Sequence, residues 1–204
     1  YEDGKIQPDL VPTATRHADK GWGLATADEP PRPQTTLESL KGLKTPFRPH
    51  GKVTAGNAAG LNDGATACIL AAEETAQELG LPVGMRLVGY SFVGVDPEVM
   101  GIGPIPAVQK LLEKIGLSVD DFDVIESNEA FAAQALAVNK GLGLDPAKVN
   151  PNGGAIALGH PVGATGAILT VKAMYELERT NTDKALVTMC IGGGQGIALA
   201  IERI

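Results

Sequence analysis

Cysteine is scarce in this chain, which has only two among its 204 residues. Cys68 and Cys190 lie far apart and do not suggest a disulfide framework, so we expect a cytoplasmic or other reducing compartment. No group of Cys and His has the spacing of metal ligands, so we expect no metal site. The sequence also lacks Gly-Lys-Ser/Thr and a G-x-G-x-x-G between strand and helix, which argues against a phosphate-binding loop.

Positive charge is also in short supply, since 17 Lys and Arg face 24 Asp and Glu and the formal net charge is -7. With no basic run, a nucleic-acid partner is not expected. No apolar run is long enough to span a bilayer and no signal-peptide core is present, so we expect no membrane partner. The first residue is Tyr1 rather than Met, which suggests a fragment, although processing also removes initiator methionines.

Residues 1–49 differ from the rest because they contain seven prolines and scattered charges. Proline fixes φ and removes a backbone donor, so this stretch cannot form long helices or central strands. Only residues 36–43 have a helical pattern, with Thr35 or Thr36 as the N-cap. We therefore expect an irregular arm that lies on a neighbouring domain.

From residue 53 onward, short apolar runs alternate with amphipathic helical patterns. The expected helices are residues 65–79, capped by Asn62 and Asp63, then 104–115, 130–140 and 163–179. The expected strands are residues 86–95, 124–127, 184–190 and 196–201, and the last two form an antiparallel hairpin. This alternation predicts an α/β layered domain. We expect a mixed, mostly parallel sheet with helices on both faces, closed by one antiparallel pair.

His160 stands on a glycine-rich turn that opens an apolar helix. Five glycines between residues 153 and 166 permit the close approach of a flat, extended ligand. A helix N-terminus favours negative charge nearby, so an imidazole there can donate a proton or a hydrogen bond to an enolate or thioester oxygen. The alternative is a structural histidine that bonds the loop to itself.

Cys190 stands where a buried strand meets three glycines at residues 192–194. A free thiol has a pKa of about 8.5, so a modest shift makes it a usable acid and base near neutral pH. The uncovered N–H groups of the glycine turn can stabilise charge that develops on a thioester oxygen. The alternative is a small core residue on a strand.

Asn128 follows the strand at 124–127 and precedes a helix. Asn is among the best N-cap residues, so a structural cap is one interpretation. The other is that its side chain holds a water that completes an oxyanion hole. Glu129 lies in the first helical turn, where the macrodipole favours it, and a structural role is sufficient.

Four conspicuous side chains receive no chemical role. His17 and His50 lie in the proline-rich arm and are expected in solvent. Trp22, between two glycines, is expected to pin the arm. Cys68 falls on the apolar stripe of the helix expected after Asn62, so we expect it in the core rather than reactive.

Five stretches now stand in a specific order along the chain. They are residues 51–64, 94–104, 128–132 (Asn-Glu-Ala-Phe-Ala), 159–163 (Gly-His-Pro-Val-Gly) and 190–192 (Cys-Ile-Gly). Together they resemble the C-terminal half of the thiolase family. The resemblance implies a thiolase-like layered fold. By it, residues 1–49 are the remnant of the loop domain that covers coenzyme A, and residues 50–204 are the C-terminal domain.

The resemblance also implies roles for individual residues. Cys190 would be the general acid and base, and His160 with an Asn128-held water would form the first oxyanion hole. The N–H of Gly192 would contribute to the second oxyanion hole. Coenzyme A and acyl-CoA would be substrates rather than tightly bound cofactors. The coenzyme A contacts of the family map onto Arg32, Ser39, Phe47, Ala55, Ala59 and Phe131.

Two departures from the family pattern matter. Many thiolases have Ser in place of Ala59, and losing that hydrogen bond costs about 0.5–1.5 kcal/mol of coenzyme A binding. The larger departure is that neither Cys68 nor Cys190 matches the acyl-carrying nucleophile, which the family's N-terminal half supplies. Covalent acyl transfer requires that nucleophile, so we expect the chain alone to be inactive.

The resemblance therefore predicts an acyltransferase of fatty acid metabolism, which thiolyses a 3-ketoacyl-CoA or condenses acyl-CoA through a cysteine acyl-enzyme. Its partners would be an N-terminal half that carries the nucleophile and, in the intact enzyme, further copies in a dimer or tetramer. The alternative is a non-catalytic acyl-CoA-binding or interaction module, which the missing nucleophile favours. Retention of Asn128, His160 and Cys190 together argues against that module.

Overall fold

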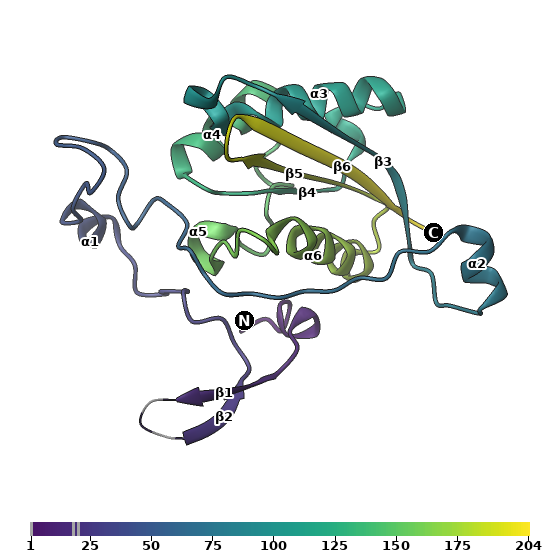
Figure 1. Cartoon of the computed structure of the whole chain (residues 1–204), viewed down its shortest axis with the longest axis horizontal. Helices are drawn as coiled ribbons and strands as arrows, with labels where there is room; N and C mark the ends of the chain where they lie inside the picture. The colour runs from purple at the N-terminus through teal and green to yellow at the C-terminus, as the bar shows by residue number, and fades with distance from the viewer. Residues whose placement is uncertain (1, 18, 20) are drawn as a thin grey trace.

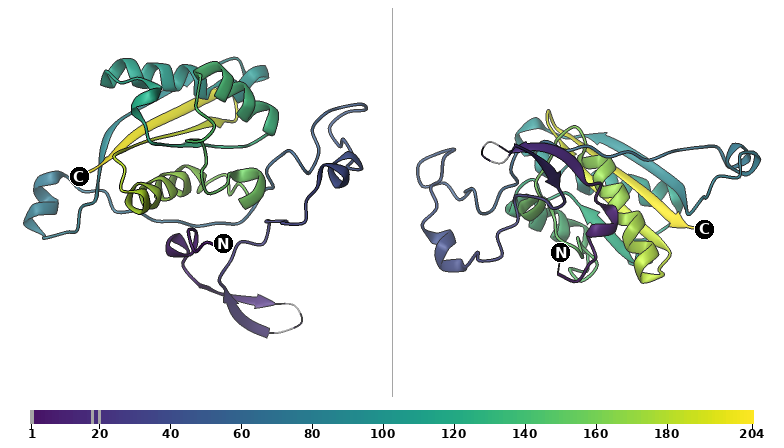
Figure 2. Two further views of the ribbon diagram at one scale, coloured as in Figure 1. Left: turned by 180° about the vertical axis from the view of Figure 1, so that it is seen from behind. Right: turned by 90° about the horizontal axis from the view of Figure 1, so that it is seen from below.

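A computed structural model of the chain describes residues 2–17, 19 and 21–204. Its core is one sheet between two layers of helices, and the N-terminal arm extends away from it (Figure 1). Helices α3 (Pro104–Ile115) and α4 (Ala132–Leu142) lie on one side of the sheet, and α6 (Thr165–Thr180) lies on the other (Figures 1 and 2). The expected α/β layers, with helices on both faces, are therefore confirmed.

The sheet has four strands in the order β3-β6-β5-β4. Their bounds are Met85–Gly94 for β3, Val124–Ser127 for β4, Lys184–Ile191 for β5 and Gln195–Arg203 for β6. Only β4 and β5 pair in parallel, whereas β6 pairs antiparallel with both β5 and β3. The expected hairpin is confirmed, but the expectation of a mostly parallel sheet is wrong. The tight glycine turn returns β6 between β5 and β3, so β3 also pairs with an antiparallel neighbour.

Two apolar clusters fix the helices to the two faces of the sheet. On one face, Val108 and Leu111 of α3 pack against Leu186 and Ala198. On the other face, Leu169, Ala173 and Leu177 of α6 pack against strand residues at alternating positions. These strand residues are Val124, Ala185, Val187 and Ile201. Because successive strand side chains point to opposite faces, residues 185 and 187 belong to the second cluster and residue 186 to the first.

Helix α3 has the bounds that the sequence predicts. Pro104 occupies its first turn, where the lost N–H has no helical partner, and Gly116 ends it in the left-handed conformation with φ of 71°. Further short elements of the described chain are the 3-10 turns η1 (Gln7–Asp9), η2 (Pro97–Ile102) and η3 (Val119–Asp121), and the one-turn helix α5 (Ala155–Leu158).

The helix expected at residues 65–79 is wrong for most of its length. Residues 65–72 are extended and run alongside α6, and only α2 (Glu73–Glu78) is helical (Figure 1). Ile69 and Leu70 are 88% and 80% exposed. Cys68 is exposed as well, so its expected place in the core is also wrong. The short apolar run fits a strand as well as a helix, and periodicity alone does not separate them.

The arm is more regular than expected. It contains a two-stranded antiparallel sheet of β1 (Thr13–His17) and β2 (Gly21–Ala25). The expected helix is confirmed as α1 (Leu37–Lys41), capped by Thr36. Trp22 is 76% exposed on β2, so it does not pin the arm. His50 is exposed as expected, whereas the side chain of His17 lies outside the description. Of the described helices, none combines the length and apolar character that a membrane crossing needs.

Candidate functional site

Three of the predicted site residues gather at one edge of the sheet. Asn128 directly follows β4, and Cys190 lies near the end of β5. Because these two strands are parallel, their carboxyl ends meet at the same edge. Helix α6 leads back into β5, so its N-terminus, which His160 precedes, lies at this edge too (Figure 1).

Asn128 is buried, with 1% of its surface exposed, and it is tied to the neighbouring strand. Its backbone N–H donates to the carbonyl of Thr188 at 3.0 Å. Its side-chain Nδ2 lies 3.2 Å from Nε2 of His160, whereas its Oδ1 is buried without a hydrogen-bond partner among the described residues. The N-cap of α4 is Phe131, so the structural-cap interpretation of Asn128 is wrong.

His160 is held by both its backbone and its ring. Its N–H lies 3.1 Å from both the carbonyl of Gly60 and Oδ1 of Asn62. Its Nδ1 lies 2.7 Å from the hydroxyl of Thr165, in the first turn of α6. Burial lowers the pKa of His160, so the neutral imidazole predominates at neutral pH. Asn62 therefore positions His160 instead of capping the helix that was expected to follow it.

The glycine-rich loop before His160 is anchored by a carboxylate. Glu129 accepts hydrogen bonds from the backbone N–H of Ile156 at 3.3 Å and from Nδ2 of Asn150 at 3.4 Å. A Cβ at Gly154 would collide with this carboxylate, so a larger residue there would push the Glu129 side chain away from the loop. Glu129 thus has a structural role, as expected, but it precedes α4 (Ala132–Leu142) and binds the first turn of α5 (Ala155–Leu158) instead of lying in the first turn of its own helix.

A buried ion pair lies beneath the loop. Nζ of Lys172 donates to Oε2 of Glu126 at 2.9 Å and to the carbonyl of Gly153 at 2.7 Å. Burial raises the pKa of Glu126 to about 7, and Lys172 opposes that shift only in part. Neither residue was expected at the site from the sequence. Glu126 sits in an apolar strand and Lys172 on a helix, and no local pattern shows that the two face each other.

Cys190 is buried near the end of β5, two positions beyond Thr188, whose carbonyl receives the Asn128 N–H. Burial raises the pKa of the Cys190 thiol, so the thiol is its resident form at neutral pH. Among the described residues, no hydrogen bond joins its sulfur to Asn128 or His160. The adjoining Gly192 is exposed, and a Cβ built there meets no atom within 4 Å. The backbone at Gly192 is therefore open to a ligand.

The six residues assigned to coenzyme A fall into separate places. Ala59 and Phe131 lie together, because the Ala59 N–H donates to the carbonyl of Ala130 at 3.0 Å and Ala58 bridges to Phe131. Ser39 lies on α1, and Ala55 lies in the turn at residues 54–57, against which Leu40 of α1 packs at Gly56. The other two, Arg32 and Phe47, are exposed on the arm.

The hydroxyl of Ser39 is already committed within the arm. It accepts the N–H of Thr36 at 3.0 Å and donates to the carbonyl of Thr36 at 2.8 Å. A ligand that used this hydroxyl as a donor would have to displace one of these bonds. In the part of the chain that the structure describes, no three His, Cys, Asp or Glu side chains gather in a way that suits a metal ion.

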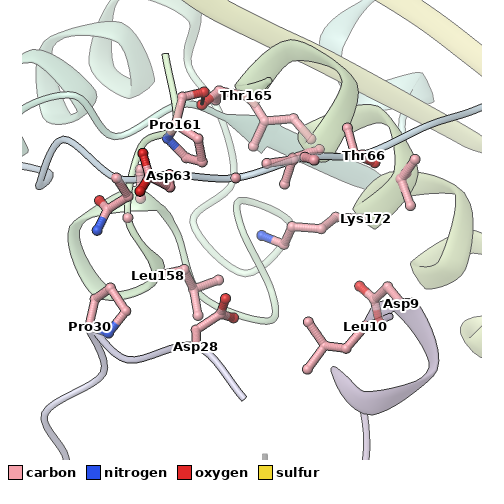
Figure 3. Close-up of a pocket in the computed structure, with 18 of the residues that line it drawn as sticks. Asp9, Leu10, Asp28, Pro30, Asp63, Thr66, Leu158, Pro161, Thr165 and Lys172 are labelled. Carbon is pink, nitrogen blue, oxygen red and sulfur yellow. Dashed lines mark hydrogen bonds between the residues drawn. The ribbon is translucent and has the colours of Figure 1, made fainter. Parts of the chain in front are cut away.

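A cavity of about 560 Å³ separates the arm from α6 (Figure 3). Its walls come from η1 and the turn before Pro30, from the extended segment, and from the helix face. Lys172 points into it, with Asp9 on the arm side and Thr165 and Pro161 at its other end (Figure 3). Asn128 also lines it, so the cavity reaches the Asn128–His160 pair.

Two family models match the chain. The model described as the thiolase C-terminal domain matches residues 81–203, and the one described as the thiolase N-terminal domain matches residues 1–74. The predicted division of the chain at residues 49 and 50 stays a prediction.

Curated relatives match nearly all of the chain. A β-ketoadipyl-CoA thiolase of Pseudomonas knackmussii is 54% identical over 203 residues, which are 98% of this chain and 50% of the relative. The β-ketothiolase BktB of Cupriavidus necator is 54% identical over 202 residues, or 98% of this chain and 51% of the relative. The chain thus spans about half the length of these relatives.

Solved structures agree with the sequence matches. The crystal structure of the acetyl-CoA acetyltransferase of Bacillus anthracis matches with a TM-score of 0.95 and 50% identity. The match covers 100% of this chain and 51% of the acetyltransferase chain. The human mitochondrial 3-ketoacyl-CoA thiolase in complex with CoA has a TM-score of 0.92 and 45% identity, with coverage of 100% and 50%. The expected thiolase-like fold is therefore confirmed.

Proposed function

The chain belongs to the thiolase family, and on that basis we propose that it forms the acid–base and oxyanion-binding half of a thiolase active site. The intact enzyme cleaves a 3-ketoacyl-CoA with coenzyme A, or condenses two acyl-CoA molecules in the reverse direction. The observation that carries this proposal is the buried contact between Asn128 and His160 at the sheet edge where β5 delivers Cys190.

The Asn128–His160 pair stabilises the enolate oxygen in this proposal. In thiolysis the bond between the α- and β-carbons breaks, and negative charge develops on the thioester oxygen of the leaving acetyl-CoA. Oδ1 of Asn128 is buried and accepts no hydrogen bond from the described residues, so it is available to orient a water. The oriented water and His160 then act as preorganised hydrogen-bond donors to the enolate oxygen. Such donors stabilise charge most where bulk water is excluded.

Cys190 supplies and removes the proton. Its raised pKa keeps the thiol protonated at neutral pH, which suits a general acid that protonates the α-carbon of the enolate. The incoming thiol of coenzyme A then returns a proton to Cys190 as it attacks the acyl-enzyme. The open backbone at Gly192 supports a second oxyanion site beside the same residue.

The nucleophile comes from polypeptide beyond these 204 residues in our proposal. Cys68 lies exposed on the extended segment, and Cys190 has the acid–base position. Covalent acyl transfer needs a separate activated thiol, so the chain alone does not turn over. The exposed Leu61, Ile69 and Leu70 support association with that companion half and, in the intact enzyme, with further copies.

Coenzyme A binds against the arm in this proposal. Ala59 lies beside Phe131, while Ser39 and Ala55 lie on α1 and on the turn that packs against α1. Arg32 suits the negatively charged nucleotide end and Phe47 offers an exposed apolar surface. A related human thiolase is described in complex with CoA, which supports the assignment. Cytoplasmic localisation, with both thiols free, remains part of the proposal.

A thiolysis assay tests the proposal. The loss of 3-ketoacyl-CoA enolate absorbance is followed with this chain alone, and again after a separately produced N-terminal thiolase half is added. Turnover only on mixing supports the proposal. Turnover by the chain alone refutes the requirement for a second nucleophile. No turnover in either case, with coenzyme A still bound, favours the acyl-CoA-binding module instead.

A further inference from the structure

Three hydrogen-bond donors surround the carbonyl oxygen of Pro161, which has two lone pairs. The backbone N–H groups of Ala164 and Thr165 donate to it at 2.8 and 2.9 Å, and the Thr165 hydroxyl lies 2.8 Å away. The same hydroxyl oxygen is 2.7 Å from Nδ1 of His160. A carbonyl oxygen has two lone pairs, which the two backbone groups already satisfy. The hydroxyl proton is therefore not tied to Pro161.

One arrangement of protons satisfies the ring of His160 on both sides. If the Thr165 hydroxyl donates to Pro161, its oxygen accepts the Nδ1–H of His160. The lone pair of Nε2 then accepts a hydrogen from Nδ2 of Asn128, at 3.2 Å. The lowered pKa of His160 keeps the ring neutral, so it carries one ring proton. In this arrangement Nε2 has no proton to donate.

The opposite arrangement is also open. If the hydroxyl turns toward the ring and donates to Nδ1, the proton of His160 lies on Nε2. Pro161 keeps its two backbone donors, so its carbonyl is not left without a partner. The Nε2–H then donates to a substrate oxygen, or the Asn128 amide turns over so that Oδ1, which is buried without a partner among the described residues, replaces Nδ2 beside Nε2 and accepts from it.

We propose that Thr165 is a positioning residue that decides which ring nitrogen of His160 carries the proton. In the resting chain the proton lies on Nδ1, and turning of the Thr165 hydroxyl allows it to lie on Nε2. The two forms interconvert by exchange with water, which gives a proton to Nε2 and removes one from Nδ1. The inference rests on the proposed function, because only a proton on Nε2 can stabilise an enolate oxygen beside Asn128.

Substitutions on α6 separate this role from a general packing role. Thr165→Val keeps the shape but removes the acceptor of the Nδ1–H, and a buried donor without an acceptor is unfavourable. The proton should therefore move to Nε2, with a change in tautomer ratio of about tenfold or more. Thr165→Ser retains the hydroxyl and should behave as the wild type.

Thr170→Val is the matched control. Its hydroxyl makes the same kind of bond within α6, to the carbonyl of Gly166 at 2.8 Å, but does not touch His160. It should leave the His160 tautomer unchanged.

The measurement is a long-range proton–nitrogen NMR spectrum of the 204-residue chain labelled with ¹⁵N-histidine. The chain has three histidines, and a His160→Asn variant identifies the signals of His160. The proposal is supported if the His160 proton lies on Nδ1 in the wild type, in Thr165→Ser and in Thr170→Val. It also requires that the proton lie on Nε2 in Thr165→Val. Nε2–H in the wild type, or no change in Thr165→Val, overturns it. If Thr165→Val does not fold, the wild-type tautomer decides alone.

These spectra need no turnover, so they separate this inference from the proposed function. The expected tautomers together with no thiolysis on mixing the halves would refute the function and leave the role of Thr165 standing. Thiolysis on mixing, together with a His160 proton on Nε2 in the wild type, would support the function and refute the role of Thr165.

Discussion

The side-chain amide of Asn128 lies 3.2 Å from Nε2 of His160, although 32 positions separate the two residues in the chain. One follows a strand and the other precedes a helix at the same edge of the sheet, and each is fixed by its own backbone bonds. The contact is therefore set by the fold rather than by a flexible side chain.

Asn128 and His160 should act as one unit in catalysis. We expect either Asn128→Ala or His160→Ala to lower kcat by about 10²-fold or more, when the variant chain is mixed with the N-terminal half. This is the usual effect of losing one donor of an oxyanion hole. The double variant should lose little beyond the worse single variant, because either change dismantles the same site. Steady-state thiolysis of the four proteins measures this. Fully multiplicative losses would show that the two residues act separately.

Glu126 should make stability fall as pH rises. Its pKa is about 7 in the folded chain against an ordinary 4.5, so the folded chain holds a proton that the unfolded chain releases. Its contribution is thus complete below about pH 4.5 and is lost as the pH rises through about 7. The unfolding free energy of the wild type, relative to that of Glu126→Gln, should therefore fall by roughly 3 kcal/mol as the pH rises across this range. Urea unfolding at several pH values measures it, and a difference that grows with pH would contradict the assignment.

The hairpin of β5 and β6 should tolerate a methyl group at one glycine and reject it at another. A Cβ at Gly196 would collide with the backbone carbonyl of Gly103, whereas a Cβ at Gly192 meets nothing within 4 Å. Gly196→Ala should therefore cost more than about 2 kcal/mol or prevent folding. Gly192→Ala, the matched control, should stay within about 0.5 kcal/mol of wild type. Urea unfolding decides, and equal stabilities would show that Gly103 moves aside freely.

The two cysteines should differ sharply in reactivity. Cys68 is exposed on the extended segment, whereas Cys190 is buried and its pKa is raised by that burial. Iodoacetamide should thus modify Cys68 first, and Cys190 only slowly and at more alkaline pH, because the thiolate is the nucleophile. Mass spectrometry over time follows both sites. The Cys68→Ser variant should retain only the slow phase, and a remaining fast phase would refute the burial of Cys190.

Local signals predicted some elements well. Pro104 and Gly116 mark the two ends of α3, because proline suits a first turn and glycine suits a left-handed end whatever the surroundings. The hairpin of β5 and β6 follows in the same way from apolar runs on either side of glycines. The motif residues Asn128 and His160 were identified from their positions at the ends of elements.

Other features depend on contacts that no local pattern contains. The direction of β3 depends on its being placed beside β6, so the expected mostly parallel sheet was wrong. Residues 65–72 read as a helix because their apolar run fits either structure, and only the three-dimensional path shows them extended. The ion pair of Glu126 and Lys172 likewise joins two elements that the sequence cannot place face to face.

The extended segment at residues 65–72 has one further consequence. Within the described part of the chain, no backbone hydrogen bond protects its N–H groups, and its side chains are almost all exposed. Its amide hydrogens should therefore exchange with deuterium within moments, while those of β5 and β6 exchange slowly. Any polypeptide that covers the segment would slow that exchange. The exchange rate of residues 65–72 therefore reports whether a candidate companion half covers this segment, before any catalysis is measured.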